Sequence, residues 1–221
     1  SVLKITDAAF AYGEQLIFQD ITLETRPGEI FCLMGRNGCG KSTLLDCILG
    51  IHPLKKGTIQ ISDKSVDAYK PAELAKKMAY LPQSHEHSFP YKVLQVVLMG
   101  RTAYMSRFGS PTQEDKVIVK NLLDKIGITH LSDRPYTQLS GGELQMVMLA
   151  RSLAQEAPLI LMDEPTAHLD YYNELLFLET IASLVKDGRQ TIFMATHSPN
   201  QAFYLENRGI PVRVGLMCNG K

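Results

Sequence analysis

Apolar and polar residues alternate through the first part of the chain, in the stretches VLKITDAAFAYG and LIFQDITLETRPGE. Alternation with a period of two is typical of strands that bury one face, and Gly13 and Pro27–Gly28 supply turns at their ends. The next stretch, EIFCLM, is apolar at almost every position. The pattern therefore predicts antiparallel strands that lead into a third, more buried strand.

Further apolar runs of strand length follow. GTIQIS and MAYLPQ are predicted strands, and a short helix is predicted from Pro71 to Lys77 between them, because proline is favoured in the first turn of a helix. PLILMDEPT is continuously apolar before its charges, which is typical of a strand covered on both faces. A helix from about Tyr172 to Lys186 separates it from another strand, QTIFMATHS. The order predicts an α/β fold.

The middle of the chain changes to helical periodicity. From Ser84 to about Thr137, apolar residues recur at helical spacing in VLQVVLMG and EDKVIVKNLLDKIG, which predicts a helical insertion. His85 and His87 lie in its entry loop, and without a third ligand in view we interpret them as solvated side chains rather than a metal site. The next stretch, LSGGELQMVMLARSLAQ, predicts one long amphipathic helix with Ser140 as its cap.

Composition narrows the function classes. The chain has 221 residues, 45% of them hydrophobic, which fits one large domain or one domain with an inserted subdomain. Lys plus Arg and Asp plus Glu both number 23, so the formal net charge is zero and nothing favours nucleic acid or anionic lipid as the main partner. The sequence has no apolar run near the roughly 18 residues of a spanning helix and no signal-peptide pattern. We therefore expect a cytosolic protein that reaches a membrane only by docking.

The four cysteines, Cys32, Cys39, Cys47 and Cys218, form no CxxC pair. This spacing favours reduced thiols in the cytoplasm over disulfides or a zinc site. Cys39 lies inside a glycine-rich loop that is described next. We hypothesise that its oxidation would block a ligand of that loop.

That loop is the stretch from Gly35 to Thr43, GRNGCGKST, and it connects the strand EIFCLM with a predicted helix from Ser42 to Leu49. The order strand, glycine-rich turn, helix is the context that a phosphate-binding loop requires. Glycines let successive backbone N–H groups converge on phosphate oxygens at a helix start that favours anions; they are Gly35, Gly38 and Gly40. Lys41 supplies a charge for the outer phosphates, and Ser42, with Thr43 beside it, supplies a hydroxyl for Mg²⁺. The loop predicts nucleotide binding.

Polar side chains follow three of the predicted strands. Asp163 and Glu164 end one strand, His197 ends another, and Gln83 follows a third. Open α/β sheets bind ligands at the carboxyl ends of their strands, so these side chains are expected at one edge. Mg²⁺ on a bound phosphate also needs a carboxylate partner.

Two more candidate ligand contacts lie outside these strands. Tyr12, between the first two strands, is either a half-buried strand aromatic or a face for an adenine ring, and the residues leave both readings open. Gly141 and Gly142 leave the backbone open behind the cap Ser140, which makes a second anion-binding helix end.

Taken in order, GRNGCGKST, Gln83, LSGGE, LILMDEP, AHLD and His197 resemble the ATP-binding subunits of ABC transporters over nearly the whole chain. The resemblance implies a P-loop NTPase fold: an ABC ATPase core with a mixed sheet, an N-terminal antiparallel β subdomain and an inserted helical subdomain. Residues 1–221 would form a single ABC ATPase domain, with the helical subdomain and its signature motif at 84–150.

The resemblance also implies the cofactors ATP and Mg²⁺ and a role for each matching position. The implied catalytic residues are Glu164, His197 and Gln83. The implied metal ligands are Ser42, Gln83 and Asp163. The implied nucleotide contacts are the adenine-stacking Tyr12, the Walker A residues Gly35, Asn37, Gly38, Cys39, Gly40, Lys41, Ser42 and Thr43, the signature residues Ser140, Gly141, Gly142 and Glu143, and the D-loop residue Asp170.

In that family two subunits pair head to tail, so that the signature of one closes on the ATP held by the other. The implied partners are a second copy of the chain, integral membrane permease subunits and, indirectly, a substrate-binding protein, at the cytoplasmic face of the bacterial inner membrane. VLMGRTAYMSRFGSPTQED, LSDRPYTQLSGGELQMVMLARSLAQ and DEPTAHLD are similar to the ATPases of importers for iron siderophores, haem and cobalamin, whose relatives carry molybdate or tungstate. A soluble ABC ATPase, such as an iron–sulfur assembly factor, is the alternative. ENRGIPVRVGLMCNGK stands where the family usually has an ADR-type segment, so the family's C-terminal helices are expected to be absent or truncated.

Overall fold

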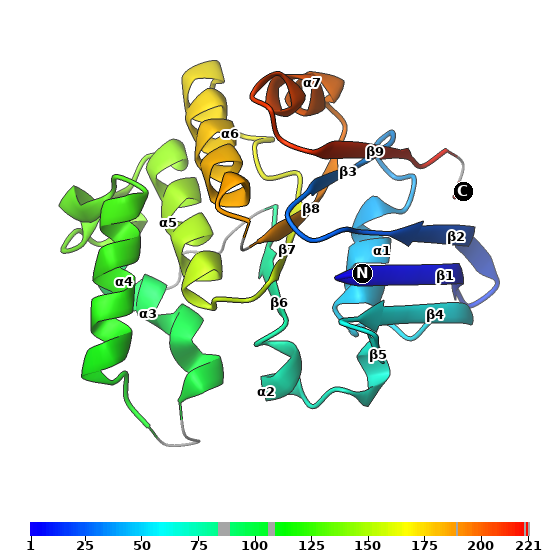
Figure 1. Cartoon of the computed structure of the whole chain (residues 1–221), viewed down its shortest axis with the longest axis horizontal. Helices are drawn as coiled ribbons and strands as arrows, with labels where there is room; N and C mark the ends of the chain where they lie inside the picture. The colour runs from blue at the N-terminus through cyan, green and yellow to red at the C-terminus, as the bar shows by residue number, and fades with distance from the viewer. Residues whose placement is uncertain (84–88, 106–108, 189, 219, 221) are drawn as a thin grey trace.

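The computed structural model describes residues 1–83, 89–105, 109–188, 190–218 and 220, and its described strands form two sheets. The antiparallel sheet has the order β2-β1-β4-β5. Its strands are β1 (Leu3–Tyr12), β2 (Gln15–Glu24), β4 (Lys56–Ile61) and β5 (Lys64–Ser65). Strands β1 and β2 pair directly, as the alternating pattern predicts. Figure 1 shows this sheet at one side of the molecule, with the N-terminus on it.

The second sheet has the order β6-β7-β8-β3-β9, and each of its neighbouring pairs is parallel. Its strands are β3 (Ile30–Met34), β6 (Met78–Leu81), β7 (Leu159–Asp163), β8 (Thr191–Thr196) and β9 (Val212–Leu216). Within the described residues, the parallel and antiparallel pairs of the expected mixed sheet therefore lie in separate sheets. The parallel arrangement brings the carboxyl ends of β3, β6, β7 and β8 to one edge.

Both faces of the parallel sheet are covered, as the continuous apolar strands predict. Alternate residues of β3 point into two different clusters: Phe31 and Leu33 pack with α1 (Lys41–Ile48) and the antiparallel sheet, whereas Cys32 packs with helices on the other face. Those helices are α5 (Gly141–Ala154), α6 (Tyr171–Lys186) and α7 (Pro199–Asn207). Helix α1, which follows the glycine-rich loop, thus lies between the two sheets (Figure 1).

Helices α3 (Val93–Leu98) and α4 (Gln113–Lys125) pack against α5, on the side of the molecule away from the antiparallel sheet (Figure 1). Helix α5 also contacts β6 and α6 and shares the core of the parallel sheet. The helical subdomain at 84–150 therefore stays a prediction, because one of its helices belongs to both packing units. His85 and His87 lie outside the described residues.

The remaining helices are short. α2 (Pro71–Leu74) is shorter than the predicted helix to Lys77, because the chain turns after Leu74 to enter β6; the 3₁₀ turns are η1 (Val66–Ala68), η2 (Met99–Tyr104), η3 (Thr129–Leu131) and η4 (Tyr136–Gln138). Among the described residues, no helix, long or short, has the length and apolar character needed to span a bilayer.

One buried ion pair holds the helical side of the molecule together. Arg101 Nε donates a 2.8 Å hydrogen bond to Asp115 Oδ1, and Arg101 Nη1 donates to the carbonyl of Ala154 at the end of α5. The hydrogen bond from Arg101 lowers the pKa of Asp115 below its ordinary value. The pair therefore fixes the start of α4 and the end of α5 to the turn that follows α3, far along the chain from the glycine-rich loop.

Candidate nucleotide-binding site

The glycine-rich loop connects β3 with α1 as the sequence predicts. Gly40, the residue before α1, has φ 104°, a conformation that is accessible to glycine and strained for other residues. Gly35 is glycine for a different reason: a Cβ built there would lie 2.6 Å from both Cys39 Sγ and the Met217 carbonyl oxygen. The loop is thus shaped by backbone conformation at one end and by lack of space at the other.

Lys41, the first residue of α1, is folded back over the loop. Its Nζ donates hydrogen bonds to the carbonyls of Gly35 at 2.7 Å and Arg36 at 3.3 Å, and the residue is only 6% exposed. The same nitrogen lies 3.5 Å from Glu164 Oε1. A buried cation therefore stands between the loop and the end of β7, where it can face phosphate oxygens.

Asp163 and Ser42 meet across the gap between β7 and α1. Burial raises the pKa of Asp163, and a hydrogen bond between its side chain and Ser42 opposes that shift. Asp163 Oδ1 is buried, and no group in the described part of the chain forms a hydrogen bond with it. A desolvated oxygen in that state is costly unless something binds it. Hydroxyl and carboxylate oxygens are ligands that Mg²⁺ prefers, so Ser42 and Asp163 fit this ion. Bound there, Mg²⁺ would neutralise charge on phosphate oxygens.

Glu164 and His197 form the other polar pair at this edge. His197 Nδ1 lies 2.7 Å from Glu164 Oε2, and the backbone N–H of His197 also points to that oxygen, at 3.4 Å. Glu164 is 9% exposed, and its other oxygen, Oε1, has no hydrogen-bond partner among the described residues, although Lys41 Nζ lies 3.5 Å from it. A carboxylate with one oxygen held and one oxygen available can accept a proton from an attacking water, and a histidine beside it can hold or pass a proton.

Most of these groups line one cavity of about 500 Å³, whereas Asp163, Gly35 and Cys39 are not among its lining residues. From the predicted site, it is lined by Asn37, Gly38, Gly40, Lys41, Ser42, Thr43, Gln83, Glu164 and His197. The edge of the parallel sheet therefore brings together residues that are far apart in the sequence. Ile17 of β2 and Ala167 line the cavity too, and neither could be predicted from the sequence, because each is an ordinary apolar residue.

Some predicted residues lie elsewhere. Tyr12 is 49% exposed at the end of β1, and its hydroxyl pairs with His52 Nε2 at 3.1 Å. Asp170 caps α6 by accepting a hydrogen bond from the backbone N–H of Asn173. The signature residues, Ser140 to Glu143, form the start of α5 and are not among the residues that line the cavity.

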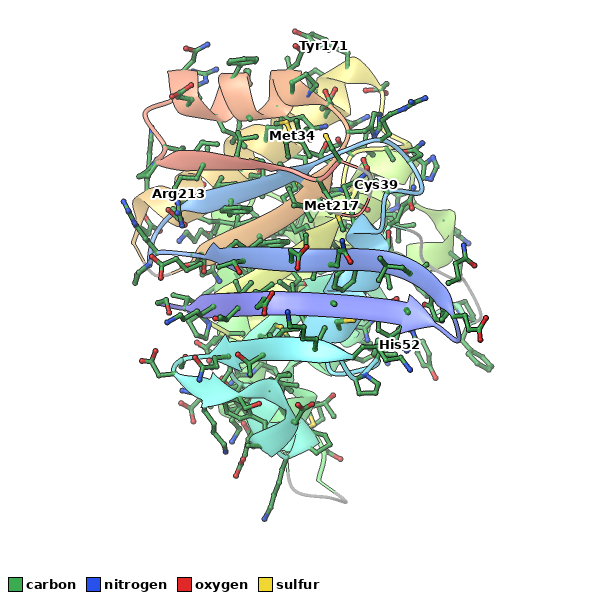
Figure 2. The ribbon with its side chains drawn as sticks, turned by 90° about the vertical axis from the view of Figure 1, so that its right-hand side faces the viewer. Met34, Cys39, His52, Tyr171, Arg213 and Met217 are labelled. Carbon is green, nitrogen blue, oxygen red and sulfur yellow. The ribbon has the colours of Figure 1, made fainter. Side chains whose placement is uncertain are left out.

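Met217, which directly follows β9 and was not singled out in the sequence, packs against the glycine-rich loop. The N–H of Met217 donates to the carbonyl of Met34, and a Cβ at Gly40 would meet Met217 Cε at 3.1 Å. Figure 2 shows Cys39 and Met217 close to each other at this end of β3. All four cysteines are free thiols, and burial raises the pKa of Cys32 and of Cys47 to about 12. The effect of Cys39 oxidation stays a prediction.

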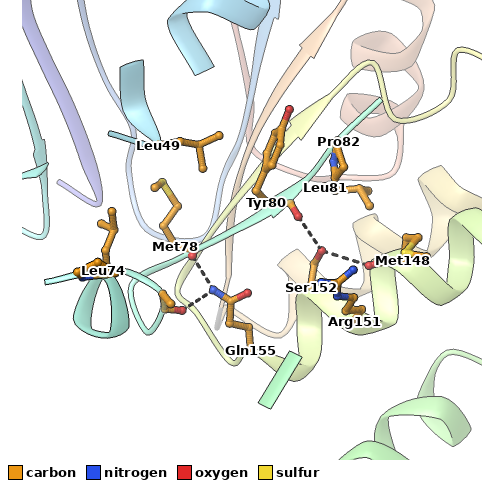
Figure 3. A pocket seen from close by; sticks show the side chains of 12 residues that line it. Leu49, Leu74, Met78, Tyr80, Leu81, Pro82, Met148, Arg151, Ser152 and Gln155 are labelled. Carbon is orange, nitrogen blue, oxygen red and sulfur yellow. Dashed lines mark hydrogen bonds between the residues drawn. The ribbon is translucent and has the colours of Figure 1, made fainter. Parts of the chain in front are cut away.

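A second cavity, of about 480 Å³, lies between β6 and α5. Figure 3 shows two side chains that bind the backbone of β6: Ser152 Oγ of α5 donates to the carbonyl of Tyr80, and Nε2 of Gln155, the residue after α5, donates to the carbonyl of Met78. Both bonds fix α5 against the strand that carries Gln83 at its exit.

A phosphate loop between a buried strand and a helix defines a nucleoside triphosphatase of the P-loop class when a lysine, a serine paired with a buried aspartate, and a glutamate–histidine pair lie beside it, as they do here. The sequence profile of the ABC transporter family matches residues 18–167, and the chain belongs to that family. As a member it is an ATPase whose hydrolysis is coupled to transport.

Two relatives and one solved structure show what the chain is similar to. It is 36% identical to the molybdate import ATP-binding protein MolC of Haemophilus influenzae over 93% of this chain and 77% of that protein. It is 34% identical to the iron(3+)-hydroxamate import ATP-binding protein FhuC of Bacillus subtilis over 97% of this chain and 80% of that protein. An inward-facing structure of a transporter assigned to the metal-chelate type is 34% identical, covers 100% of this chain and 80% of its own, and superposes with a TM-score of 0.86.

Proposed function

We propose that the chain hydrolyses Mg²⁺-bound ATP at interfaces between two head-to-tail copies, and that it thereby energises uptake of a metal chelate or metal oxyanion through a separate membrane permease. The observation that carries the proposal is the difference between two helix N-termini in one chain. The N-terminus of α1 opens into the cavity lined by Lys41 and Glu164, whereas the N-terminus of α5, at Ser140 and Gly141, is exposed to solvent.

Each residue of the cavity has a task in this proposal. The loop and Lys41 bind the phosphates, and Ser42 and Asp163 hold the metal, with Gln83 as a further ligand. Glu164 Oε1, for which the described residues provide no hydrogen-bond partner, accepts the proton of the attacking water, while Oε2 stays with His197. Tyr12 stacks on the adenine ring. Fixed positioning and charge compensation provide most of the rate enhancement in phosphoryl transfer.

A second copy would supply the bound phosphate that the exposed N-terminus of α5 in the first copy lacks. Gly141 has open space around it, so the start of α5 can approach a phosphate from another molecule without clashing. A helix N-terminus favours an anion, which makes the γ-phosphate its natural ligand. ATP would then hold two copies together by contacts that disappear after hydrolysis, and Asp170 would lie near the same interface.

The names of the relatives support the proposed class of substrate. Their names specify molybdate and iron(3+)-hydroxamate, and the similar transporter structure is of the metal-chelate type. A membrane permease and, indirectly, a substrate-binding protein are the proposed partners, and the chain would lie at the cytoplasmic face of the membrane.

The native complex tests this function. We expect affinity purification from membranes to recover a polytopic permease with the chain, and reconstituted vesicles to accumulate an iron chelate or molybdate only when ATP is present on the side of this subunit. Glu164→Gln in the same complex serves as the control without turnover. Recovery of soluble assembly proteins without a permease would favour the alternative, an iron–sulfur assembly ATPase, and would contradict the proposal.

A further inference from the structure

The backbone immediately around Glu164 is held in an unusual conformation. Glu164 has φ 44°, in the left-handed region that side chains other than glycine rarely adopt. Its N–H donates to the carbonyl of Ala195 in β8 at 2.9 Å, which fixes one side of the residue. A strained residue persists only where its surroundings hold it, so the contacts of the next residues, Pro165 and Thr166, decide where the carboxylate points.

A buried glutamine of the signature helix holds the first of these residues. Gln145, in the second turn of α5, is 7% exposed, and its Nε2 donates a 2.6 Å hydrogen bond to the carbonyl of Pro165. A buried amide that donates to one particular carbonyl holds that carbonyl in place, because no water is available there to replace the hydrogen bond. Helix α5 is thereby attached directly to the residue after Glu164.

A second buried glutamine, from α7, holds the next residue. Gln201 is 5% exposed, and its Nε2 donates to Thr166 Oγ1 at 2.6 Å and to Glu174 Oε1 at 2.7 Å. Its Oε1 accepts a 2.9 Å hydrogen bond from Thr196 Oγ1, and that hydroxyl accepts one from the N–H of Ser198.

Thr196 and Ser198 are the two neighbours of His197 in the chain. A single amide therefore joins the segment after Glu164 to the segment that carries His197. The other groups in this network are Thr166 and Glu174, which also bond to each other, at 3.3 Å.

We propose that Gln145 and Gln201 are positioning residues for hydrolysis: together they hold the backbone after Glu164 so that its carboxylate stays paired with His197 at the cavity. This deepens the proposed function and rests on it, since it takes Glu164 as the proton acceptor. Neither glutamine lines the cavity, so neither is expected to contribute to ATP binding.

The test compares isosteric variants that remove these hydrogen bonds. We expect Gln145→Met and Gln201→Met each to lower kcat for ATP at least about ten-fold, because small displacements of a reacting group cost large factors in rate. The dissociation constant for ATP, measured by calorimetry, is expected to stay within about two-fold of the parental value, because the phosphate loop is untouched.

Gln155→Met is the matched control. Gln155 directly follows the last residue of the helix that contains Gln145, and it donates its amide hydrogens to the backbone carbonyls of Ala75 and Met78 (Figure 3). Gln155→Met removes comparable hydrogen bonds at the C-terminal end of α5, and we expect this variant to keep kcat within about two-fold of the parental value. Thr166→Val provides a second route to the same contact if Gln201→Met does not fold.

A further measurement separates positioning from a general loss of structure. In a Glu164→Gln background the residual single-turnover rate should not fall further when Gln145→Met is added, because both changes act through the same group. The proposal is overturned if the folded glutamine variants keep parental kcat, if ATP affinity falls as much as kcat, or if Gln155→Met is equally slow. Parental turnover by Glu164→Gln alone would instead overturn the proposed role of Glu164.

Discussion

Two helix N-termini in this chain are suited to anions, and they differ in what surrounds them. Helix α1 begins after Gly40, which offers no side chain as a cap, and the groups beside it are buried: Lys41 is 6% and Asp163 is 5% exposed. Helix α5 begins with a complete capping box, in which Ser140 and Glu143 each accept a hydrogen bond from the other's backbone N–H. The N-terminus of α1 is therefore prepared for a ligand, whereas at the N-terminus of α5 the backbone N–H groups of Ser140 and Glu143 are already bonded within the capping box.

Charges at the N-terminus of α5 are also paired within the chain. The hydrogen bond from the Ser140 backbone lowers the pKa of Glu143, so this carboxylate stays charged at the helix start, and Arg134 Nη1 pairs with it at 3.0 Å. A free anion therefore gains little at α5 by itself. A phosphate that is already bound at α1 of another molecule loses no further translational freedom when it meets α5. A helix N-terminus that binds free anions weakly can therefore still contribute in a dimer.

The largest effect on turnover is expected from a change in the cavity at the N-terminus of α1. Glu164→Gln removes the proton acceptor and should lower kcat by about 10²–10⁴-fold while ATP binding is retained, which would accumulate an ATP-bound dimer. Turnover assays and size-exclusion chromatography with ATP check this. If the variant hydrolysed ATP at the parental rate, we would withdraw the role given to Glu164.

Lys41→Ala should give a smaller loss that concerns binding. Hydrogen bonds to charged groups are worth about 1.5–3 kcal/mol, so ATP affinity should fall by roughly 10- to 150-fold. Calorimetry measures the affinity directly. Lys4→Ala, on an exposed position of β1, is a suitable control, and unchanged ATP binding by the Lys41 variant would remove the basis for the nucleotide site.

The smallest effect concerns Tyr12, which lies outside the residues that line the cavity. If its ring stacks on adenine, Tyr12→Ala should lower ATP affinity about ten-fold, in line with base–aromatic stacking of about 1–3 kcal/mol. Tyr12→Phe keeps the ring and loses the hydrogen bond to His52, so it should bind ATP like the parent. Equal affinities for all three proteins would mean that Tyr12 is only a strand aromatic.

Much of the fold could be predicted because apolar periodicity responds directly to burial. Alternation marked β1 and β2, and the continuous run before Asp163 marked a strand covered on both faces. The polar groups at strand ends were predictable because parallel strands present their carboxyl ends at one edge.

The supporting contacts could not be predicted in the same way. Gln145 and Gln201 lie in amphipathic helices, where a glutamine in the sequence looks like any solvent-exposed polar residue, yet both are buried against backbone or side-chain oxygens. The left-handed conformation of Glu164 is also invisible in sequence, because it depends on strand β8 and two helices. The separation of parallel from antiparallel pairs required the three-dimensional arrangement.

The central claim is that each working site combines the buried helix end of one copy with the exposed helix end of another. Lys41→Ala disables the first end, and Gly141→Asp places a negative charge at the second, where the added side chain meets open space and folding should be unaffected. Gly141→Ala is the matched control and should be active. The decisive measurement is ATP hydrolysis by a one-to-one mixture of the two disabled variants.

At an ATP concentration that saturates the parental protein but lies well below the dissociation constant of Lys41→Ala, each variant alone is expected to be inactive, whereas the mixture should regain roughly a quarter of the parental activity. Random pairing makes half of the dimers mixed, and each mixed dimer holds one intact site. A mixture that stays as inactive as its two components, under conditions where the parental protein hydrolyses ATP, would contradict the shared site.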